Sequence, residues 1–240
     1  MTEAWRPFER ALEDAWAGRA SPLGVRSDVG RSEDVDPGLF LRAPDTFEEW
    51  ERFALDRAVG PVLDLGAGAG AHALALQEAG VPVTAVDVLP EAVRIMRARG
   101  VRDARCSSIE AFLANPRTGG RAGPWATGLL LMNGTMPFGT LARFRGGLAR
   151  WPTPPSRIVL DSTDLRDGVS DERDDGRYVG EAQYQFTYEG EAGAPIPQLF
   201  VDPDRLDRIA DATGWDSEVL WRGERGHYLA ELTLRSESAR

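Results

Sequence analysis

Residues 62–70, VLDLGAGAG, decide the fold of this chain. A short apolar run that contains Asp64 passes directly into alternating glycines, which is typical of a buried strand followed by a tight loop. Glycines let the backbone approach a ligand closely, because no Cβ stands in the way. A second apolar run, residues 83–87 (VTAVD), ends in Asp87, 17 residues after Gly70. The pair predicts two adjacent parallel strands that hold a nucleotide-like cofactor at their carboxyl ends, with Asp87 accepting hydrogen bonds from a ribose diol.

Strand and helix patterns alternate from this point onward. Strands are predicted at residues 62–65, 83–86, 104–107, 128–132 and 158–160, and helices at 70–79, 90–99 and 140–151. Pro90 suits a first helical turn, and Gly100 suits the position just past a helix end. Short strands that alternate with helices imply right-handed crossovers and a parallel sheet covered on both faces. We therefore expect an α/β fold with a Rossmann-like, doubly wound sheet.

The two ends of the chain show other patterns. In the N-terminal part we expect an amphipathic helix over residues 3–17, an irregular lead-in over 18–44, and a capping box at 46–49 (TFEE) that starts a helix containing Trp50. In the C-terminal part we expect a charged, mobile loop over 164–177, an antiparallel strand over 183–188, a helix from Pro203 to just before Gly214, and a hairpin formed by 219–221 and 228–234.

The composition excludes several classes of protein and site. The 240 residues suffice for one domain with a sizeable core. Lys and Arg number 28 and Asp and Glu number 38, so the net charge is −10, and no basic stripe is present to bind a nucleic acid. Cys106 is the only cysteine, and His72 and His227 are the only histidines, so we expect no disulfide and no metal site. No apolar run could span a bilayer and the polar start lacks a signal-peptide pattern, so we expect a soluble, cytoplasmic protein with no membrane partner.

The glycine loop favours S-adenosylmethionine (SAM) over NAD or FAD, although sites for all three share a G-x-G loop. Asp64 stands two residues before the first glycine, where its carboxyl can reach the amino-acid end of SAM directly or through water. The loop reads GAGAG, and not the G-x-G-x-x-G that brings a helix against a pyrophosphate. After the fifth strand the chain offers a hairpin and no second mononucleotide half. An NAD-dependent oxidoreductase is therefore the less favoured alternative.

Residues 64–70 (DLGAGAG) and Asp87 resemble motif I and the following acidic position of class I SAM-dependent methyltransferases. The resemblance extends from about residue 25 to 235, and residues 62–77 are similar to the start of an uncharacterised bacterial small-molecule subgroup. The segments 129–134 (LLLMNG), 158–162 (IVLDS) and 199–202 (LFVD) also resemble that subgroup. The resemblance implies a mostly parallel seven-stranded sheet with an antiparallel last strand, an N-terminal helical lid and a small inserted antiparallel strand pair.

The resemblance also implies a set of residues that bind SAM. In this set Asp87 binds the ribose, Val88 and Leu89 cover one face of the adenine, and Ile109 covers the other. Ser108 stands where many relatives have an acid near the adenine amino group, and is a weaker partner. The full set is Asp64, Gly66, Ala67, Gly68, His72, Asp87, Val88, Leu89, Ser108, Ile109 and Asn133.

Two positions in this set, His72 and Leu89, are less typical of a SAM site. His72 lies in the first helical turn beside the glycine loop, so it is a candidate ligand, although a surface residue at a helix start is the more ordinary interpretation. Leu89-Pro90 departs from the Ser-Pro of the subgroup and loses a helix N-cap, at a cost of about 1 kcal/mol.

Three residues near the ends of later strands are candidates for catalysis: Asn133, Asp161 and His227. Asn133 follows the fourth strand, where open α/β sheets place their ligands. Asp161 could be a general base or could cap a loop, and His227 begins the last strand, from which it could approach a substrate. Asn133 also stands where metal-dependent catechol O-methyltransferases have an acid, so we expect no metal ion.

The predicted function is methyl transfer from SAM to a small-molecule acceptor by in-line SN2 displacement, with S-adenosylhomocysteine (SAH) as product. Alternatives are a SAM enzyme that uses the sulfonium charge for cyclisation or elimination, and a non-enzymatic SAM-binding module. We expect a monomer or homodimer whose single domain comprises an N-terminal helical lid (1–58), a SAM-binding core (59–162) and a substrate-side part (163–240). The acceptor is expected above the fourth and fifth strands, enclosed by the N-terminal helix and residues 133–138 and 184–200.

Overall fold

The large sheet of the protein has seven strands in the order β11-β12-β7-β6-β3-β4-β5. The computed structural model describes residues 3–30, 32–114, 125–149, 151, 156–166 and 172–235. The strands are β3 (Val62–Leu65), β4 (Val83–Asp87), β5 (Ala104–Cys106), β6 (Thr127–Leu130), β7 (Arg157–Thr163), β11 (Trp215–Arg222) and β12 (His227–Leu234). Strands β3 to β7 pair in parallel, and β12 runs antiparallel to both of its neighbours. This confirms the Rossmann-like doubly wound sheet with an antiparallel last strand. The winding direction changes between β3 and β6, which is where such sheets bind ligands.

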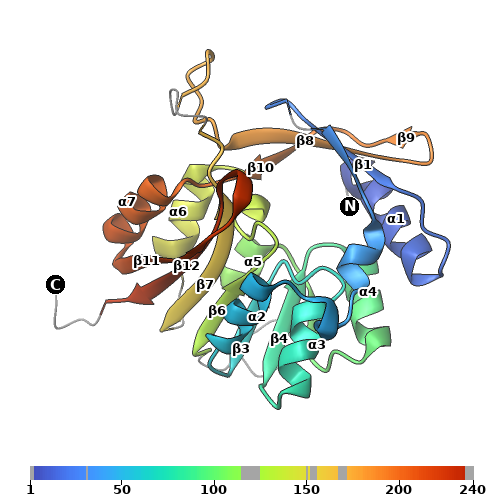
Figure 1. Cartoon of the computed structure of the whole chain (residues 1–240), viewed down its shortest axis with the longest axis horizontal. Coiled ribbons are helices and arrows are strands. Elements are labelled where there is room, and N and C mark those ends of the chain that lie inside the picture. The colour runs from blue at the N-terminus through green and yellow to red at the C-terminus, as the bar shows by residue number, and fades with distance from the viewer. Residues whose placement is uncertain are drawn as a thin grey trace.

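Helices cover both faces of this sheet (Figure 1). One face carries α2 (Glu49–Asp56), α3 (Ala71–Glu78) and α4 (Pro90–Arg99), and the other carries α5 (Ile109–Ala114), α6 (Leu141–Ala149) and α7 (Pro203–Thr213). Side chains along β3 point alternately to the two faces of the sheet, so helices must cover both faces. Val62 packs with α2 and α3, whereas Leu63 and Leu65 pack with α5, α6 and α7. A strand that is apolar on both sides is stable only when both are covered.

A second, smaller sheet lies across one end of the molecule (Figure 1). Its strands are β1 (Leu23–Ser27), β2 (Ser32–Val35), β8 (Glu181–Tyr188), β9 (Glu191–Ala192) and β10 (Ile196–Leu199), all paired antiparallel in the order β10-β8-β1-β2, with β9 beside β8. Alternate residues of β8 are buried, as the sequence predicts for residues 183–188. The helix α1 (Arg6–Trp16), which follows a 3-10 turn at Glu3–Trp5, packs against β8, β1 and α4.

This sheet corrects one prediction for the N-terminal part. Residues 18–44 are not an irregular lead-in, because β1 and β2 lie within them, followed by a 3-10 helix at Pro37–Leu41. The small inserted antiparallel strand pair is confirmed by β8 and β10, and the N-terminal strands extend the same sheet. Local sequence does not mark β1, because its hydrogen bonds go to β8, about 160 residues later in the chain, as well as to β2.

The start of α2 is also shifted from its predicted place. The capping box is formed by Glu48 and Glu51, and not by residues 46–49. Glu51 Oε2 accepts the Glu48 amide at 3.0 Å. Thr46 instead ends a short 3-10 turn, and its hydroxyl donates to the Ala43 carbonyl at 2.7 Å. Phe47 lies between that turn and the helix, with an extended backbone and a buried side chain that is 3% exposed.

Other predicted elements agree with the structure to within a few residues, and two predicted segments lie partly outside the described residues. The helix from Pro90 to Gly100, the helix from Pro203 to Gly214 and the C-terminal hairpin are confirmed. The six-residue helix α5 is an addition, because it is too short to show a hydrophobic period. Residue 150 of the expected helix over 140–151 and residues 167–171 of the expected loop over 164–177 lie outside the described residues. No helix in the described part of the chain is long and apolar enough to cross a membrane.

Candidate functional site

The glycine loop between β3 and α3 has left-handed backbone at all three glycines, with φ of 77° at Gly66, 55° at Gly68 and 81° at Gly70. Their roles differ. A Cβ at Gly70 would lie 2.8 Å from Met96 and 2.9 Å from Val101, so this glycine allows α3 to pack closely on α4. A Cβ at Gly68 would meet nothing within 4 Å. The loop is therefore open at Gly68, the point where a ligand can approach the backbone.

Asp87, at the end of β4, supports the loop from the neighbouring strand. Its Oδ2 accepts the Gly68 amide at 2.8 Å and its Oδ1 accepts the Leu89 amide at 2.9 Å. Burial raises the pKa of Asp87 to about 6, although backbone amides favour the ionised form. An ionised carboxylate has about four lone-pair sites, so Asp87 can accept further donors.

Asp64, on β3, carries an unsatisfied oxygen. The residue is 2% exposed, and its Oδ2 is buried with no hydrogen-bond partner among the described residues. Burial raises the pKa of Asp64 to about 6, while nearby His72 favours and nearby Asp87 opposes the ionised form. A buried carboxylate oxygen without a donor is costly, which indicates that a ligand supplies one.

His72 is not a surface residue, which corrects that expectation. It is 8% exposed, and its Nε2 lies 2.7 Å from Oε1 of Glu51 on α2. The guanidinium of Arg42 donates to the same oxygen. Burial opposes ionisation of Glu51, but hydrogen bonds from His72 and the Glu48 amide lower its pKa overall. His72 is buried because α2 and the preceding segment pack over the first turn of α3, and it therefore joins a polar chain that reaches toward Asp64.

The residues predicted around the adenine separate into two groups. Val88 follows Asp87 and is 43% exposed, so its side chain is free to contact a ligand. Leu89 is 4% exposed and packs among residues of α1 and α4. Ile109 is 6% exposed and belongs to the core beneath the sheet, and Ser108 accepts the Ala111 amide at the start of α5. The structure thus brings Asp64, Gly66, Ala67, Gly68 and Asp87 together and gives Leu89, Ile109 and Ser108 packing or capping roles.

The start of α4 has a cap that the sequence does not predict. Leu89, the N-cap residue, makes no side-chain cap hydrogen bond. Glu9 of α1 accepts the Glu91 backbone amide instead, and burial raises the pKa of Glu9. The cap missing from Leu89-Pro90 is therefore supplied by a distant helix, and the contact also ties α1 to α4.

Asn133, Asp161 and His227 form a second polar cluster, at the carboxyl ends of β6 and β7. Asp161 is 1% exposed, and its carboxylate accepts the Asn133 amide at 2.8 Å and the Gly134 amide at 3.3 Å. The Nε2 of His227 lies 2.7 Å from Oδ2 of the same carboxylate. Thr163 donates to Oδ1 of Asn133 at 2.7 Å. Met132 and Asn133 have φ of 67° and 56°, and these contacts hold that unusual backbone in place.

His227 reaches this cluster because β12 runs antiparallel to β7. The first residue of β12 therefore lies at the carboxyl edge of the sheet, where His227 pairs with Thr163. Two indoles contact its ring edge to face, Trp50 at 4.7 Å and Trp221 at 5.3 Å between ring centroids. The imidazole is thus held by Asp161 on one side and by aromatic rings on the others, with about a fifth of its side chain exposed.

Solved structures establish the family of this chain. It is 32% identical to a SAM-dependent methyltransferase from Bacteroides fragilis in complex with SAH, with a TM-score of 0.81, over 98% of this chain and 97% of that one. The protein is a class I SAM-dependent methyltransferase. No protein-family model matches the chain, and no curated protein matches it.

Two further structures share the fold of this methyltransferase. The CcbJ methyltransferase from Streptomyces caelestis is 15% identical over 82% of this chain and 92% of its own, with a TM-score of 0.58. The sugar N-methyltransferase KedS8 from a Streptoalloteichus species is 15% identical over 86% and 96%, with a TM-score of 0.53. Related structures contain SAH or SAM. Methyl transfer from SAM is therefore the activity of this chain's family.

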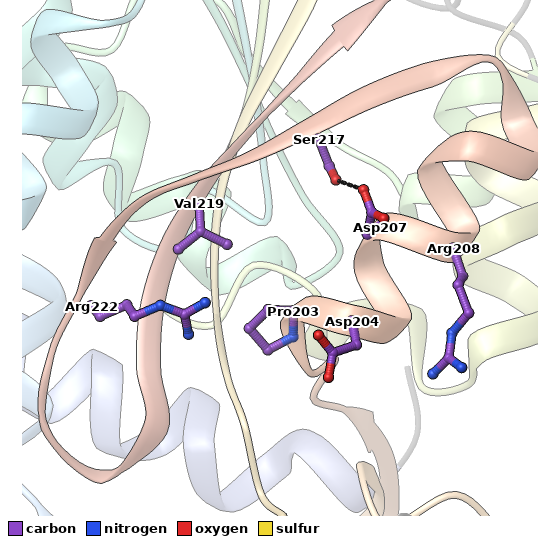
Figure 2. A pocket seen from close by; sticks show the side chains of 7 residues that line it. All are labelled: Pro203, Asp204, Asp207, Arg208, Ser217, Val219 and Arg222. Carbon is purple, nitrogen blue, oxygen red and sulfur yellow. Dashed lines mark hydrogen bonds between the residues drawn. The ribbon is translucent and has the colours of Figure 1, made fainter.

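A hollow in the surface of the methyltransferase lies away from the glycine loop. Figure 2 shows it between α7 and β11, with Ser217 donating to Asp207 at 2.5 Å. It is lined by Pro203, Asp204, Asp207, Arg208, Ser217, Val219 and Arg222. Because β11 and β5 are the two opposite edge strands of the large sheet, this hollow is remote from the cofactor strands.

Sequence analysis missed four charged residues that support the elements around the candidate site: Glu9, Arg42, Glu51 and Arg99. Each acts across a tertiary contact, on a helix or loop distant in sequence. Glu51 offers the one usable signal, because it stands on the buried face of α2 beside Trp50 and Ala54, where an unpaired acid is rare.

Proposed function

We propose that this methyltransferase transfers the methyl group of SAM to a small-molecule acceptor by in-line displacement and without a metal ion. The observation that carries the proposal is the hydrogen-bonded pair of His227 and Asp161 beside Asn133, at the carboxyl edge of β6 and β7. This edge adjoins the glycine loop, because β6 is the neighbour of β3. His227 is thus a candidate base next to β3 and β4, the strands that carry the proposed SAM-binding residues.

The residues around Gly68 fit SAM. The free lone pairs of Asp87 suit the two hydroxyls of a ribose, and the unpartnered Oδ2 of Asp64 suits the ammonium at the amino-acid end. The open side of Gly68 gives the backbone of Gly66, Ala67 and Gly68 room to contact the ligand. The exposed side chain of Val88 is the proposed contact for the adenine, with Leu89, Ser108 and Ile109 in the wall behind it, and His72 is proposed near the amino-acid end, beside Asp64. When bound, SAM supplies an electrophilic methyl group.

His227 is the proposed general base, and Asp161 orients it. The Asp161 carboxylate accepts one backbone amide on each of its two oxygens, so it is the acceptor in its contact with His227 as well. Its contact with Nε2 therefore places the ring proton on Nε2 and leaves the lone pair on Nδ1 to accept a proton from the acceptor. Asp161 is 1% exposed and has three partners, whereas about a fifth of the His227 side chain is exposed, so the proton-accepting role is assigned to the imidazole. Asn133 keeps its amide nitrogen for a substrate oxygen, because its Oδ1 is bonded to Thr163.

The covering of the site supports a small acceptor. The small sheet and α1 lie over the end of the molecule that holds the carboxyl edge (Figure 1). Trp5, Phe8, Phe40 and Phe186 contact one another by ring stacking and edge-to-face packing beneath this cover. The net charge of −10 opposes a nucleic-acid acceptor. The fold relative KedS8 is a sugar N-methyltransferase, so the scaffold serves a small acceptor there.

The donor set around Asn133 does not suit a divalent metal. Asp161 is committed to two amides and an imidazole. In the described part of the chain no group of three or more His, Cys, Asp or Glu side chains is arranged to hold a metal ion. We propose on these grounds that the acceptor is activated by His227 alone.

The functional division of the domain is proposed as a lid (1–58), a SAM-binding core (59–162) and a substrate-side part (163–240). The substrate-side part contains β12, which supplies His227, and β8 and β10 of the cover. The lid supplies α1 and also β1 and β2, so both parts build the cover together.

The experiment that tests the proposal is a screen for SAH release with SAM and small phenols, alcohols, amines and carboxylic acids, each run with and without EDTA. We expect turnover with one acceptor class, unchanged by EDTA. Turnover that EDTA abolishes and Mg²⁺ restores would overturn the metal-independent mechanism. Release of SAH only with protein or nucleic-acid acceptors would overturn the small-molecule proposal.

SAH affinity should depend on pH through Asp87 and Asp64. The pKa of each is raised from 3.8 to about 6, so between these values the folded protein keeps protons that the unfolded chain has lost. Their contribution to stability is thus fully present below pH 3.8 and is lost as pH rises through 6. Binding of a ribose and an ammonium favours the ionised forms, so we expect affinity to rise roughly tenfold for each of the two carboxyls from pH 5 to pH 7. Calorimetry in buffers of different ionisation enthalpy measures the affinity and the released protons, and a flat profile would contradict the assignment.

SAH should protect Cys106 from thiol reagents. Cys106 ends β5 directly opposite Asp87, is exposed, and its Sγ lies 3.7 Å from the Val88 carbonyl. Burial and the charge of Asp87 raise the pKa of this thiol, so the free protein reacts slowly. A bound adenosine that covers Val88 should slow alkylation at least about fivefold, and mass spectrometry reports it cleanly because the chain has one cysteine. Equal rates with and without SAH would place the adenosine elsewhere.

A further inference from the structure

The guanidinium of Arg99, in the last turn of α4, joins two segments that are distant in sequence. It donates to the Ala69 carbonyl in the glycine loop at 2.7 Å. It also donates to three consecutive carbonyls that precede α2, those of Phe40 at 3.4 Å, Leu41 at 2.9 Å and Arg42 at 3.2 Å. One side chain therefore fastens the backbone of residues 40–42 to the loop that surrounds Gly68.

All four acceptors of the Arg99 guanidinium are neutral backbone carbonyls. The side chain is half-buried, and burial lowers the pKa of Arg99. The planar guanidinium has five donors in a fixed arrangement, which lets it serve several carbonyls at once, whereas a lysine has three donors at one point. The arrangement is thus specific to arginine.

The fastened segment carries groups that reach the cofactor site. Phe40 and Leu41 pack with Ala69 and Leu89 in one apolar cluster with α1. Arg42 extends the other way and donates to Glu51, which holds His72 near Asp64. If residues 40–42 moved away, both the apolar cover of the loop and the charged chain behind Asp64 would be lost.

We propose that Arg99 is a positioning residue for SAM, which holds residues 40–42 and the glycine loop together in the conformation that binds the cofactor. Arg99 affects the affinity for SAM indirectly, through its contacts with the backbone of Ala69 and Arg42. Arg99 itself contacts neither SAM nor the acceptor. The proposal depends on SAM binding alone, so it is tested without knowledge of the acceptor.

The experiment compares Arg99→Met and Arg99→Lys with the matched control Arg97→Met. Arg97 lies on the same helix and also donates to one backbone carbonyl, that of Ala104 at 2.8 Å, at the start of β5 and away from the glycine loop. Calorimetry with SAH gives the affinity, thermal unfolding without ligand gives the stability, and hydrogen exchange reports the amides of residues 39–42 with and without SAH.

We expect Arg99→Met to weaken SAH binding at least tenfold and to remove the SAH-dependent protection of residues 39–42, while its melting temperature matches that of Arg97→Met. Arg99→Lys should recover only part of the affinity. SAH affinity within twofold of wild type in Arg99→Met or Arg99→Lys would overturn the proposal. An equal loss of affinity in Arg97→Met would also overturn it, because the effect would then be one of general stability. If Arg99→Met does not fold, Arg99→Lys decides by the same criterion.

Discussion

Replacing Asp87 by alanine is expected to abolish measurable cofactor binding, with the dissociation constant of SAH raised at least about 100-fold. Hydrogen bonds to a charged group are worth about 1.5–3 kcal/mol each, and two ribose hydroxyls would lose theirs. The variant also loses the acceptor for the Gly68 amide, which fixes the loop. Calorimetric titration with SAH, on protein shown to be folded by circular dichroism, measures the change.

Asp103→Ala is the matched control for Asp87→Ala. Asp103 also bonds to β4, through Thr84, and to Arg105, but it lies at the opposite, amino-terminal edge of the sheet. We expect this control to lose stability and to keep its affinity for SAH. The Asp87→Ala protein, in contrast, should remain as stable as wild type, because it no longer buries a carboxyl whose pKa is raised to about 6. Retained SAH affinity in Asp87→Ala would remove the basis for placing the ribose on β4.

The second large effect is expected at His227. Loss of a general base costs about 10²–10⁴-fold in rate, so His227→Gln should reduce kcat by that factor with the acceptor that the SAH-release screen identifies. Its affinity for SAH should stay within about twofold of wild type, because the imidazole lies at the ends of β7 and β12 and not on the cofactor strands. Steady-state kinetics with that acceptor measure kcat, and calorimetry with SAH measures the affinity.

The Asp161→Asn variant distinguishes the orienting role of Asp161 from the proton-accepting role of His227. An amide can no longer serve as the charged acceptor for Nε2 and for the backbone amides of Asn133 and Gly134, so the ring loses its fixed tautomer. We expect a smaller loss of kcat than in His227→Gln, because the imidazole that accepts the proton is still present. If His227→Gln keeps full activity, the pair only supports the loop after β6, and the acceptor reaches the enzyme already deprotonated.

Both predictions follow from one property of the large sheet. Asp87 and His227 stand at the same edge because β4 runs parallel to β3 whereas β12 runs antiparallel to β7, so one strand ends and the other begins there. The proposed cofactor residues lie on one side of the switch between β3 and β6, and the proposed acceptor residues lie on the other. The chemistry is thus divided between the two halves of the sheet.

The sequence alone determined the cofactor half of this protein. The apolar runs at 62–65 and 83–87, the glycines between them and the acids at their ends are local patterns, and local patterns define the strands, the loop and the parallel connection. The helix from Pro90 to Gly100 and the C-terminal hairpin are likewise marked by residues that start or stop an element. Asp64 and Asp87 were found for the same reason, because each stands at a fixed place in such a pattern.

The tertiary structure alone decided how distant residues complete the site. Residues 23–27 become a strand because β8 pairs with them as well as β2, and Glu9 caps α4 because α1 packs there. His72 is buried because α2 covers it, and Asp161 meets His227 because the last strand turns back. Arg99 fastens segments that lie 30 and 57 to 59 residues away in the chain. Such contacts leave no periodic trace in the sequence, since a charged side chain that bonds across elements looks the same in the chain as one that faces water.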